Sequence, residues 1–176
     1  MRACSSSTVS TVYGQLADLT TYYPDFESWY WTKVVPGLGD QSRALFVHEE
    51  RGQFSVVIAK RTLGERKLCT IRTNPKLLGR RIATNLIFEA IDWLRCEKPL
   101  ITVPEERLPE FKSIFGRLDF SLGQIADSYY RLDRREYIFN GKIASGRECS
   151  LPRFRSYIDR PHLLDGKRSP IPLHAV

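Results

Sequence analysis

The chain has 176 residues, of which 42% are hydrophobic and 27% are charged, and its formal net charge at pH 7 is +7. This length and composition are typical of one folded domain and exclude a wholly disordered protein. No apolar stretch reaches the roughly 18 residues that cross a bilayer, and the serine-rich N-terminus is unlike a signal peptide, so we expect a cytoplasmic protein with no membrane partner.

The first forty residues predict two helices. Apolar side chains at helical spacing over residues 12–19 indicate a short first helix. A second helix is expected after Pro24, with Phe26, Trp29, Tyr30 and Val34 on its buried side. We expect Pro36 and the following glycine to end it.

Three antiparallel strands should follow. Residues 43–49 and 54–59 are rich in strand formers and predict a hairpin that turns at Gly52. Residues 67–73 predict a third strand that ends at Asn74 and Pro75. Simple alternation would place Leu68, Thr70 and Arg72 on one face and Cys69, Ile71 and Thr73 on the other.

The second half of the chain alternates between helices and strands. It predicts helices over residues 81–96 and 105–118, and strands over residues 99–103, 120–130 and 136–139. This order implies an α/β (α+β) fold with a mixed, mostly antiparallel sheet flanked by helices. We expect a domain over residues 1–141 and a basic, proline-containing extension over residues 142–176 that wraps the domain or is mobile.

The most informative segment joins the third predicted strand to the following helix. The first N–H groups of a helix have no internal partners and lie at the positive end of its dipole, so they bind phosphate. Arg80 and Arg81 add positive charge at this point, and Gly79 gives the loop conformational freedom. The segment therefore predicts an anion site around residues 78–84.

This segment resembles the acyl-CoA loop of the GNAT acyltransferases, which has the pattern Q/R-x-x-G-x-G/A between the fourth strand and the third helix. Ala83 takes the last position, whereas Leu78 replaces the usual Gln or Arg and Arg81 replaces the first Gly. The order of elements over about residues 22–141 is also similar to that family. The resemblance implies a cofactor site for acetyl-CoA, the acyl donor, in which the loop holds the pyrophosphate and strand backbone holds the pantetheine arm. The implied site residues are Ile71, Arg72, Thr73, Leu78, Gly79, Arg80, Arg81, Ile82, Ala83 and Thr84.

The catalytic groups are less evident. Many family members have an acidic Tyr in the fourth helix, and the matching position here is Phe115, which we expect to pack in the core. Candidates for an acid or a base are Tyr129, Tyr130 and Glu49, with His48 and Glu50 beside Glu49. Each of them also fits a surface or packing role, and water could relay the proton. Cys69 has no His near it in the sequence and suits a buried small residue better than a nucleophile.

The four cysteines form no CxxC pair and the three histidines are scattered, which indicates neither a metal site nor a disulfide framework. The leading hypothesis is an N-acetyltransferase that moves an acetyl group from acetyl-CoA to a primary amine by direct attack. The acceptor could be a protein amine, a small molecule or an aminoacyl-tRNA, and the enzyme a monomer or a homodimer. Two alternatives stay open: a GNAT-like binding module with weak or no activity, and a basic RNA-binding protein.

Overall fold

The computed structural model describes residues 6–143 of the chain. Its helical segments are α1 (Ser6–Leu16), η1 (Ala17–Thr21), α2 (Phe26–Trp29), η2 (Tyr30–Val34), α3 (Val35–Gly39), η3 (Pro75–Leu77), α4 (Ile82–Leu94), η4 (Glu105–Arg107) and α5 (Leu108–Arg117). Its strands are β1 (Arg43–Glu50), β2 (Gln53–Arg61), β3 (Arg66–Thr73), β4 (Leu100–Pro104), β5 (Leu122–Asp127) and β6 (Arg135–Phe139). The expected extension over residues 142–176 lies outside the described residues, apart from its first two positions.

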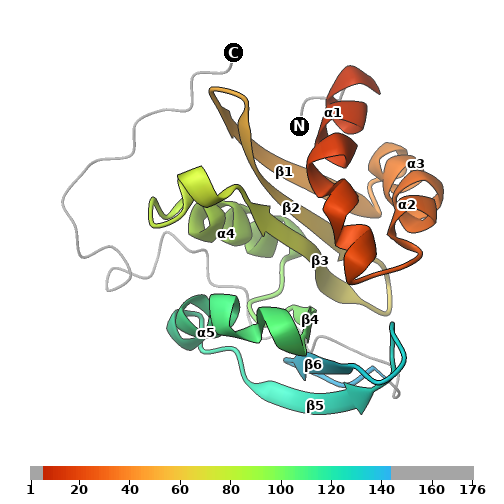
Figure 1. Ribbon diagram of the computed structural model, residues 1–176, viewed down its shortest axis with the longest axis vertical. Helices are drawn as coiled ribbons and strands as arrows, with labels where there is room; N and C mark the ends of the chain where they lie inside the picture. The colour runs from red at the N-terminus through yellow and green to blue at the C-terminus, as the bar shows by residue number, and fades with distance from the viewer. Residues whose placement is uncertain (1–5, 144–176) are drawn as a thin grey trace.

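Within the described residues, the strands form one sheet in the order β1-β2-β3-β4-β6-β5. Every neighbouring pair is antiparallel except β3 and β4, which are parallel. This pair is joined only at Lys67 with Leu100 and at Leu68 with Ile101, after which the two strands separate. Figure 1 shows the result, a sheet split into a half with β1–β3 and a half with β4–β6. The predicted mixed, mostly antiparallel sheet flanked by helices is confirmed.

The helices before β1 run further than the sequence suggested. The expectation that Pro36 ends the second helix is wrong, because Pro36 lies in the first turn of α3 and the helix continues to Gly39. A first-turn position needs no N–H donor, so proline is tolerated there. The preceding segment, η2, is a π-helical turn between two α-helical ones.

The hairpin and the third strand lie where they were expected. Arg51 and Gly52 form the turn between β1 and β2 with φ of 51° and 72°, the left-handed conformation that two-residue hairpins require. β5 is shorter than predicted, since Asp119 and Ser128 have positive φ and bound the strand on either side. The boundaries of β5 are therefore set by turns whose sequence signal is weak.

A β-bulge in β3 changes the expected face pattern. Ile58 pairs with Thr70 and Ala59 with Leu68, which leaves Cys69 without a partner in the ladder. Leu68 and Ile71 consequently pack on the same side of the sheet, in the core beneath α4, while Cys69 packs on the other side. The prediction that Leu68 and Ile71 lie on opposite faces is wrong, because it assumed an unbroken alternation.

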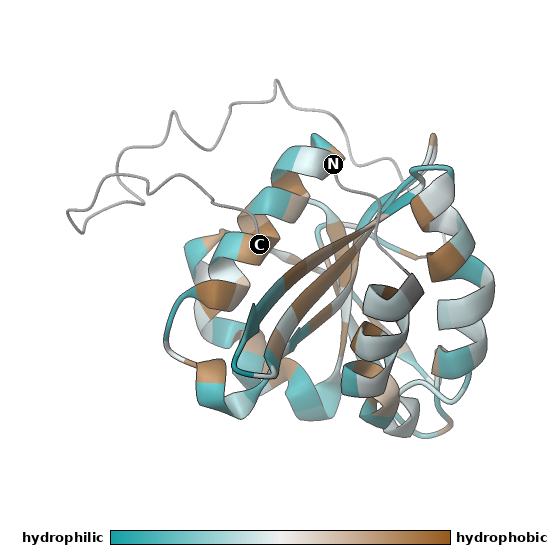
Figure 2. Cartoon of the chain, turned by 90° about the horizontal axis from the view of Figure 1, so that it is seen from above, coloured by the Kyte–Doolittle hydropathy of each residue, from teal (hydrophilic) through white to brown (hydrophobic). Residues whose placement is uncertain are grey.

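Two hydrophobic cores cover the two faces of the sheet. One lies between the sheet and α4 and α5, and it includes Leu86, Leu94 and Phe115. The other lies between the sheet and α1–α3, and its centre is the fully buried Tyr30, whose hydroxyl donates to the carbonyl of Val9 at 2.9 Å. Figure 2 shows hydrophobic strands between helices on both sides. Each fully buried side chain of this size contributes roughly 1.5–3 kcal/mol.

Candidate functional site

The loop between β3 and α4 has the backbone of a tight turn. Asn74 accepts a hydrogen bond from the N–H of Lys76 and so starts η3 immediately after β3. Gly79 has φ of 76°, and Arg81, the N-cap of α4, has φ of 59°. Arg81 replaces a glycine of the family pattern, yet it adopts the left-handed conformation that glycine favours.

This conformation leads to a prediction for position 81. Arg81→Gly is expected to change the free energy of unfolding by less than about 0.5 kcal/mol, because the lost strain offsets the added freedom of the unfolded chain. Arg81→Val is expected to lower it by about 2 kcal/mol, since a β-branched residue strongly disfavours positive φ. Urea unfolding of both variants measures the difference. Equal stability of the two would contradict the role assigned to φ.

A cleft of about 340 Å³ opens at the N-terminus of α4, between the end of β3 and α5. We call it the anion cleft. The side chain of Arg81 does not cap α4, and the first turn of α4 has no acidic residue. The N–H groups of Ile82, Ala83 and Thr84 therefore stay uncapped at the positive end of the helix dipole. Arg81, Arg107 and Arg117 line the cleft, and Glu110 is the only acid that lines it among residues 6–143. The cleft thus has the charge and the donors that a pyrophosphate needs.

Eight of the ten residues predicted to hold the cofactor line the anion cleft. They are Ile71, Thr73, Leu78, Gly79, Arg81, Ile82, Ala83 and Thr84. The other two, Arg72 and Arg80, do not line it. The guanidinium of Arg72 pairs with Asp18 of η1, and that of Arg80 donates to Glu50 of β1 at 2.7 Å. Both cations are thereby held by acids outside the cleft.

A small cavity of about 50 Å³, the central cavity, lies where β3 and β4 separate. Its wall includes residues 68–71 of β3 and residues 101–104 of β4. It shares Ile71, Arg107 and Phe111 with the anion cleft. Beyond Leu68, β3 pairs with β2 but not with β4, so the backbone groups that point toward β4 are open to a ligand in this gap.

A third cavity, of about 340 Å³, lies on the side of the sheet that carries α2. We call it the aromatic cavity, because Tyr23, Phe26, Trp29 and Tyr130 line it. It shares Tyr23, Cys69, Thr70 and Thr102 with the central cavity. The three cavities therefore follow one another through the gap in the sheet, from the anion cleft to the opposite face.

The predicted acid and base candidates are only partly brought together. Tyr130 lines the aromatic cavity, and its hydroxyl accepts a hydrogen bond from the ammonium of Lys67 at 3.5 Å. The neighbouring Tyr129 packs its ring against that of Tyr130 but lines none of the three cavities. Glu49 lies near the hairpin turn, at the end of β1 opposite to the aromatic cavity, and also lines none of them.

Cys69 is a free thiol in the bulge of β3. Burial raises the pKa of this thiol, which disfavours the nucleophilic thiolate. Cys69 is half-buried rather than fully buried, and it packs with the core beneath α1–α3. Cys96 is disulfide-bonded, a pairing that the cysteine spacing did not indicate. Among residues 6–143, no three His, Cys, Asp or Glu side chains gather as a metal site requires.

Sequence reasoning missed a buried carboxyl group close to this site. Glu136 of β6 is only 3% exposed, and its Oε2 atom has no hydrogen-bond partner in the described structure. Burial raises the pKa of Glu136 to about 7, although the positive charges of Lys67 and Arg131 lower it in part. Its position in the sequence was the available signal. Glu136 lies two residues before the buried Ile138 on β6, so both side chains point to the same, buried face of the sheet.

The shifted pKa of Glu136 makes stability depend on pH. A carboxyl group whose pKa is higher in the folded than in the unfolded state favours folding below the unfolded pKa, and this contribution is lost as the pH rises through about 7. Between pH 5 and pH 8, the wild type should therefore lose on the order of 2–3 kcal/mol relative to Glu136→Gln, which cannot ionise. Urea unfolding at both pH values tests this. Parallel pH dependence of the two proteins would refute it.

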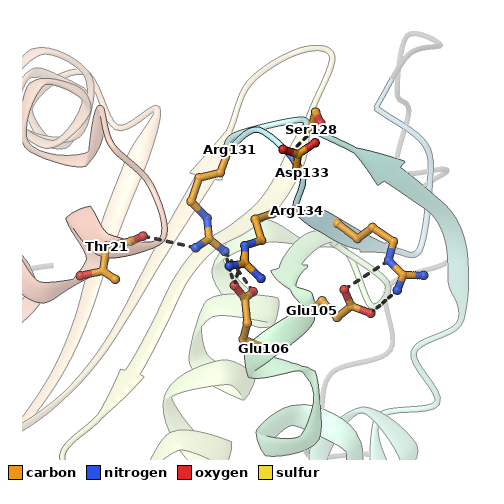
Figure 3. A network of polar contacts seen from close by, with 8 residues as sticks. Thr21, Glu105, Glu106, Ser128, Arg131, Asp133 and Arg134 are labelled. Atoms are coloured by element: carbon orange, nitrogen blue, oxygen red, sulfur yellow. Dashed lines mark hydrogen bonds and ion pairs between the residues drawn. The ribbon is translucent and has the colours of Figure 1, made fainter.

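The turn between β5 and β6, which carries Tyr130, is anchored by ion pairs (Figure 3). The guanidinium of Arg131 donates to the carboxylate of Glu106 in η4 at 2.7 Å and to the carbonyl of Thr21 in η1 at 3.4 Å. Arg135 of β6 pairs with Glu105 at 2.7 Å. η1 packs against the half of the sheet with β1–β3, and η4 directly follows β4 of the other half. Arg131 therefore connects the two halves beside the gap.

No helix in the described part of the chain is long and apolar enough to span a membrane. No family model and no curated protein matches the sequence. Solved structures do match the fold. A GNAT-family protein from Desulfovibrio desulfuricans is 14% identical, with a TM-score of 0.61 over 79% of this chain and 94% of that one.

Two further matches are N-acetyltransferases. The ribosomal-protein-S18-alanine N-acetyltransferase from Escherichia coli is 14% identical, with a TM-score of 0.56 over 78% of this chain and 89% of that one. An aminoglycoside 6′-N-acetyltransferase complexed with coenzyme A is 10% identical, with a TM-score of 0.50 over 77% of this chain and 90% of that one. Their fold has the same mixed sheet flanked by helices that the chain shows. The chain has the GNAT fold.

Proposed function

We propose that the protein is an acyl-CoA-dependent N-acyltransferase that moves an acetyl group from acetyl-CoA to a primary amine. The observation that carries this proposal is the line of three cavities through the gap between β3 and β4. One end has the charge and the helix N-terminus that suit a pyrophosphate. The other end is a separate cavity on the opposite face, where a second substrate can approach the thioester.

In this proposal the anion cleft binds the pyrophosphate of CoA through the N–H groups of Ile82, Ala83 and Thr84 and through Arg81. Arg117 adds a second cation that forms no ion pair within the described residues. The pantetheine arm then extends along residues 71–73 of β3, on the edge that faces β4 and is not paired with it. The match to a protein solved with coenzyme A supports this assignment of the donor.

The chemical step is a direct transfer. The lone pair of the neutral amine attacks the thioester carbonyl carbon, a C–N bond forms, and the C–S bond breaks. The amine proton leaves through solvent or a nearby base, and CoA departs as the thiol. Holding the amine and the thioester in line lowers the barrier by several kcal/mol, so the reaction does not depend on a strong acid. This fits the presence of Phe115, a residue of α5 that is buried in the core, at the position where the resemblance predicts an acidic Tyr.

Calorimetric titration with acetyl-CoA, followed by thiol-release assays with amines, tests the proposal. Saturable binding and amine-dependent release of CoA would support it. Binding without transfer to any amine would favour a GNAT-fold binding module. Absence of binding would overturn the proposal and leave an RNA-binding role to be tested by salt-dependent affinity. Arg72 and Arg80 are less available to RNA phosphates, because each already forms an ion pair with an acidic residue. The cytoplasmic location and the oligomeric state stay predictions.

A further inference from the structure

The aromatic cavity is charged in an uneven way. Among the described residues, five acidic or basic side chains line it, namely Asp25, Arg43, Lys60, Glu65 and Lys67. Lys60 and Glu65 form an ion pair with each other, so neither charge is free to bind a ligand. Arg43, Lys67 and Asp25 form no ion pair with any other residue of the described chain. The wall therefore presents three cations and two carboxylates, and Arg43 and Lys67 have no ion-pair partner among the described residues, although the charges of Glu65 and Glu136 lie near Lys67.

The two cations are held in place by neutral neighbours. The guanidinium of Arg43 lies over the ring of Trp29 at 5.5 Å and donates through Nε to the carbonyl of Lys33 at 2.9 Å. The ammonium of Lys67 donates to the hydroxyl of Tyr130 at 3.5 Å. Contacts of this kind orient a cation without neutralising its charge. Both groups thus stay available to an anionic group of a ligand, and a guanidinium suits a carboxylate especially well.

Much of the rest of the wall is aromatic, although Thr70 and Thr102 also line it. Rings of Tyr23, Phe26 and Trp29 enclose the cavity, and the rings of Tyr23 and Tyr130 are in edge contact at 5.0 Å. A volume of about 340 Å³ is near the lower end of the range for small-molecule sites, which is of the order of 300–1,000 Å³. The cavity is thus of the right size for a single small molecule with an apolar or aromatic body.

We propose that the acceptor is a free amino acid with an apolar or aromatic side chain, whose carboxylate binds Arg43 and Lys67 while its amine faces the thioester in the central cavity. The inference rests on the proposed function and names its second substrate. Asp25 provides the complementary charge for the ammonium form before the amine loses its proton. A polyamine, which brings only positive charge, would meet two unpaired cations in this cavity and is disfavoured.

A matched pair of acceptors tests the inference. Phenylalanine and phenethylamine share the amine and the ring and differ only in the carboxylate. Initial rates of thiol release with saturating acetyl-CoA should give a kcat/KM at least about tenfold higher for phenylalanine, the ratio that one charge-assisted contact supports. Higher kcat/KM for phenethylamine or for spermidine would overturn the inference while leaving the acyltransferase function intact.

Two variants locate the carboxylate site. Lys67→Met keeps the apolar stem and removes the charge, and it should raise KM for phenylalanine about tenfold with less than a threefold change for phenethylamine. Lys112→Met removes the same charge from an exposed position on α5 outside the three cavities, and it should change neither value. An equal effect of Lys67→Met on both amines would contradict the assignment.

Failure of the proposed function would be visible separately, as absence of acetyl-CoA binding in calorimetry. The cavity can then still be tested by saturation-transfer NMR of phenylalanine with the wild-type protein. Binding that weakens in Lys67→Met and persists in Lys112→Met would support the amino acid site. Absence of phenylalanine binding to the wild type would overturn it.

Discussion

Arg81→Glu is expected to lower the affinity for acetyl-CoA by roughly 30- to 100-fold at low salt, the largest functional effect that the anion cleft predicts. Arg81 lines the cleft at the N-cap of α4 and makes no ion pair within the described residues. Its replacement by Glu removes one attractive charge and adds one repulsive charge. The new carboxylate can also occupy the free N–H groups of the helix, since these bind any nearby anion.

Arg80→Glu is the matched control, because it makes the same change of charge one residue earlier. Arg80 is bound to Glu50 and does not line the cleft, so this variant should weaken acetyl-CoA binding by less than about fivefold at physiological salt. Calorimetric titration of both variants, with circular dichroism to confirm folding, distinguishes a specific site from general electrostatic attraction. Equal losses for Arg80→Glu and Arg81→Glu would place the binding site elsewhere.

Phe115→Ala is expected to lower the free energy of unfolding by about 3–5 kcal/mol. Phe115 is 4% exposed, and its ring contacts those of Phe111, Phe120 and Phe139 at centroid distances of 5.2, 5.4 and 4.6 Å. Removing the ring leaves a cavity in the core beneath α5. Urea unfolding measures the loss. Leu63→Ala, at a fully exposed position, should differ from the wild type by less than about 0.5 kcal/mol.

A second variant at this position addresses catalysis. Phe115→Tyr introduces the residue that the resemblance to the GNAT family predicts at this position, but it places a hydroxyl among phenylalanine rings. We expect a loss of about 1–3 kcal/mol in stability and no gain in the rate of acetyl transfer. A faster enzyme would show that the hydroxyl reaches the leaving thiol, and that Phe115 is not purely a core residue.

Local signals predicted most of the fold correctly. The turn at Gly52 and the stop at Asn74 are short-range features, so the hairpin and β3 lie where they were expected. The stripe of apolar residues through α4 predicted both its length and its buried side, of which Leu86 and Leu94 are examples. A cleft does lie at the helix start that follows the glycine-containing loop, while its role as an anion site stays a prediction.

Features that depend on distant residues could not be predicted in the same way. The bulge at Cys69 shifts the alternation of the residues that follow it in β3 to the opposite face, and it is defined only by pairing with β2. The ion pair of the Arg72 side chain joins it to Asp18, 54 positions earlier in the chain, and no local pattern predicts such a contact. The aromatic cavity likewise combines residues from 23 to 130. Such a site exists only in the folded sheet.

The place of β6 in the sheet has a consequence for how the chain acquires its structure. β6 is the last strand along the described sequence, but it lies between β4 and β5 and pairs with both. During synthesis, β1–β3 can pair early, because the pairings of β1 with β2 and of β2 with β3 are made within that segment. β4 and β5 have no common neighbour until residues 135–139 emerge, so the side of the gap that carries β4 is the last part of the domain to become ordered.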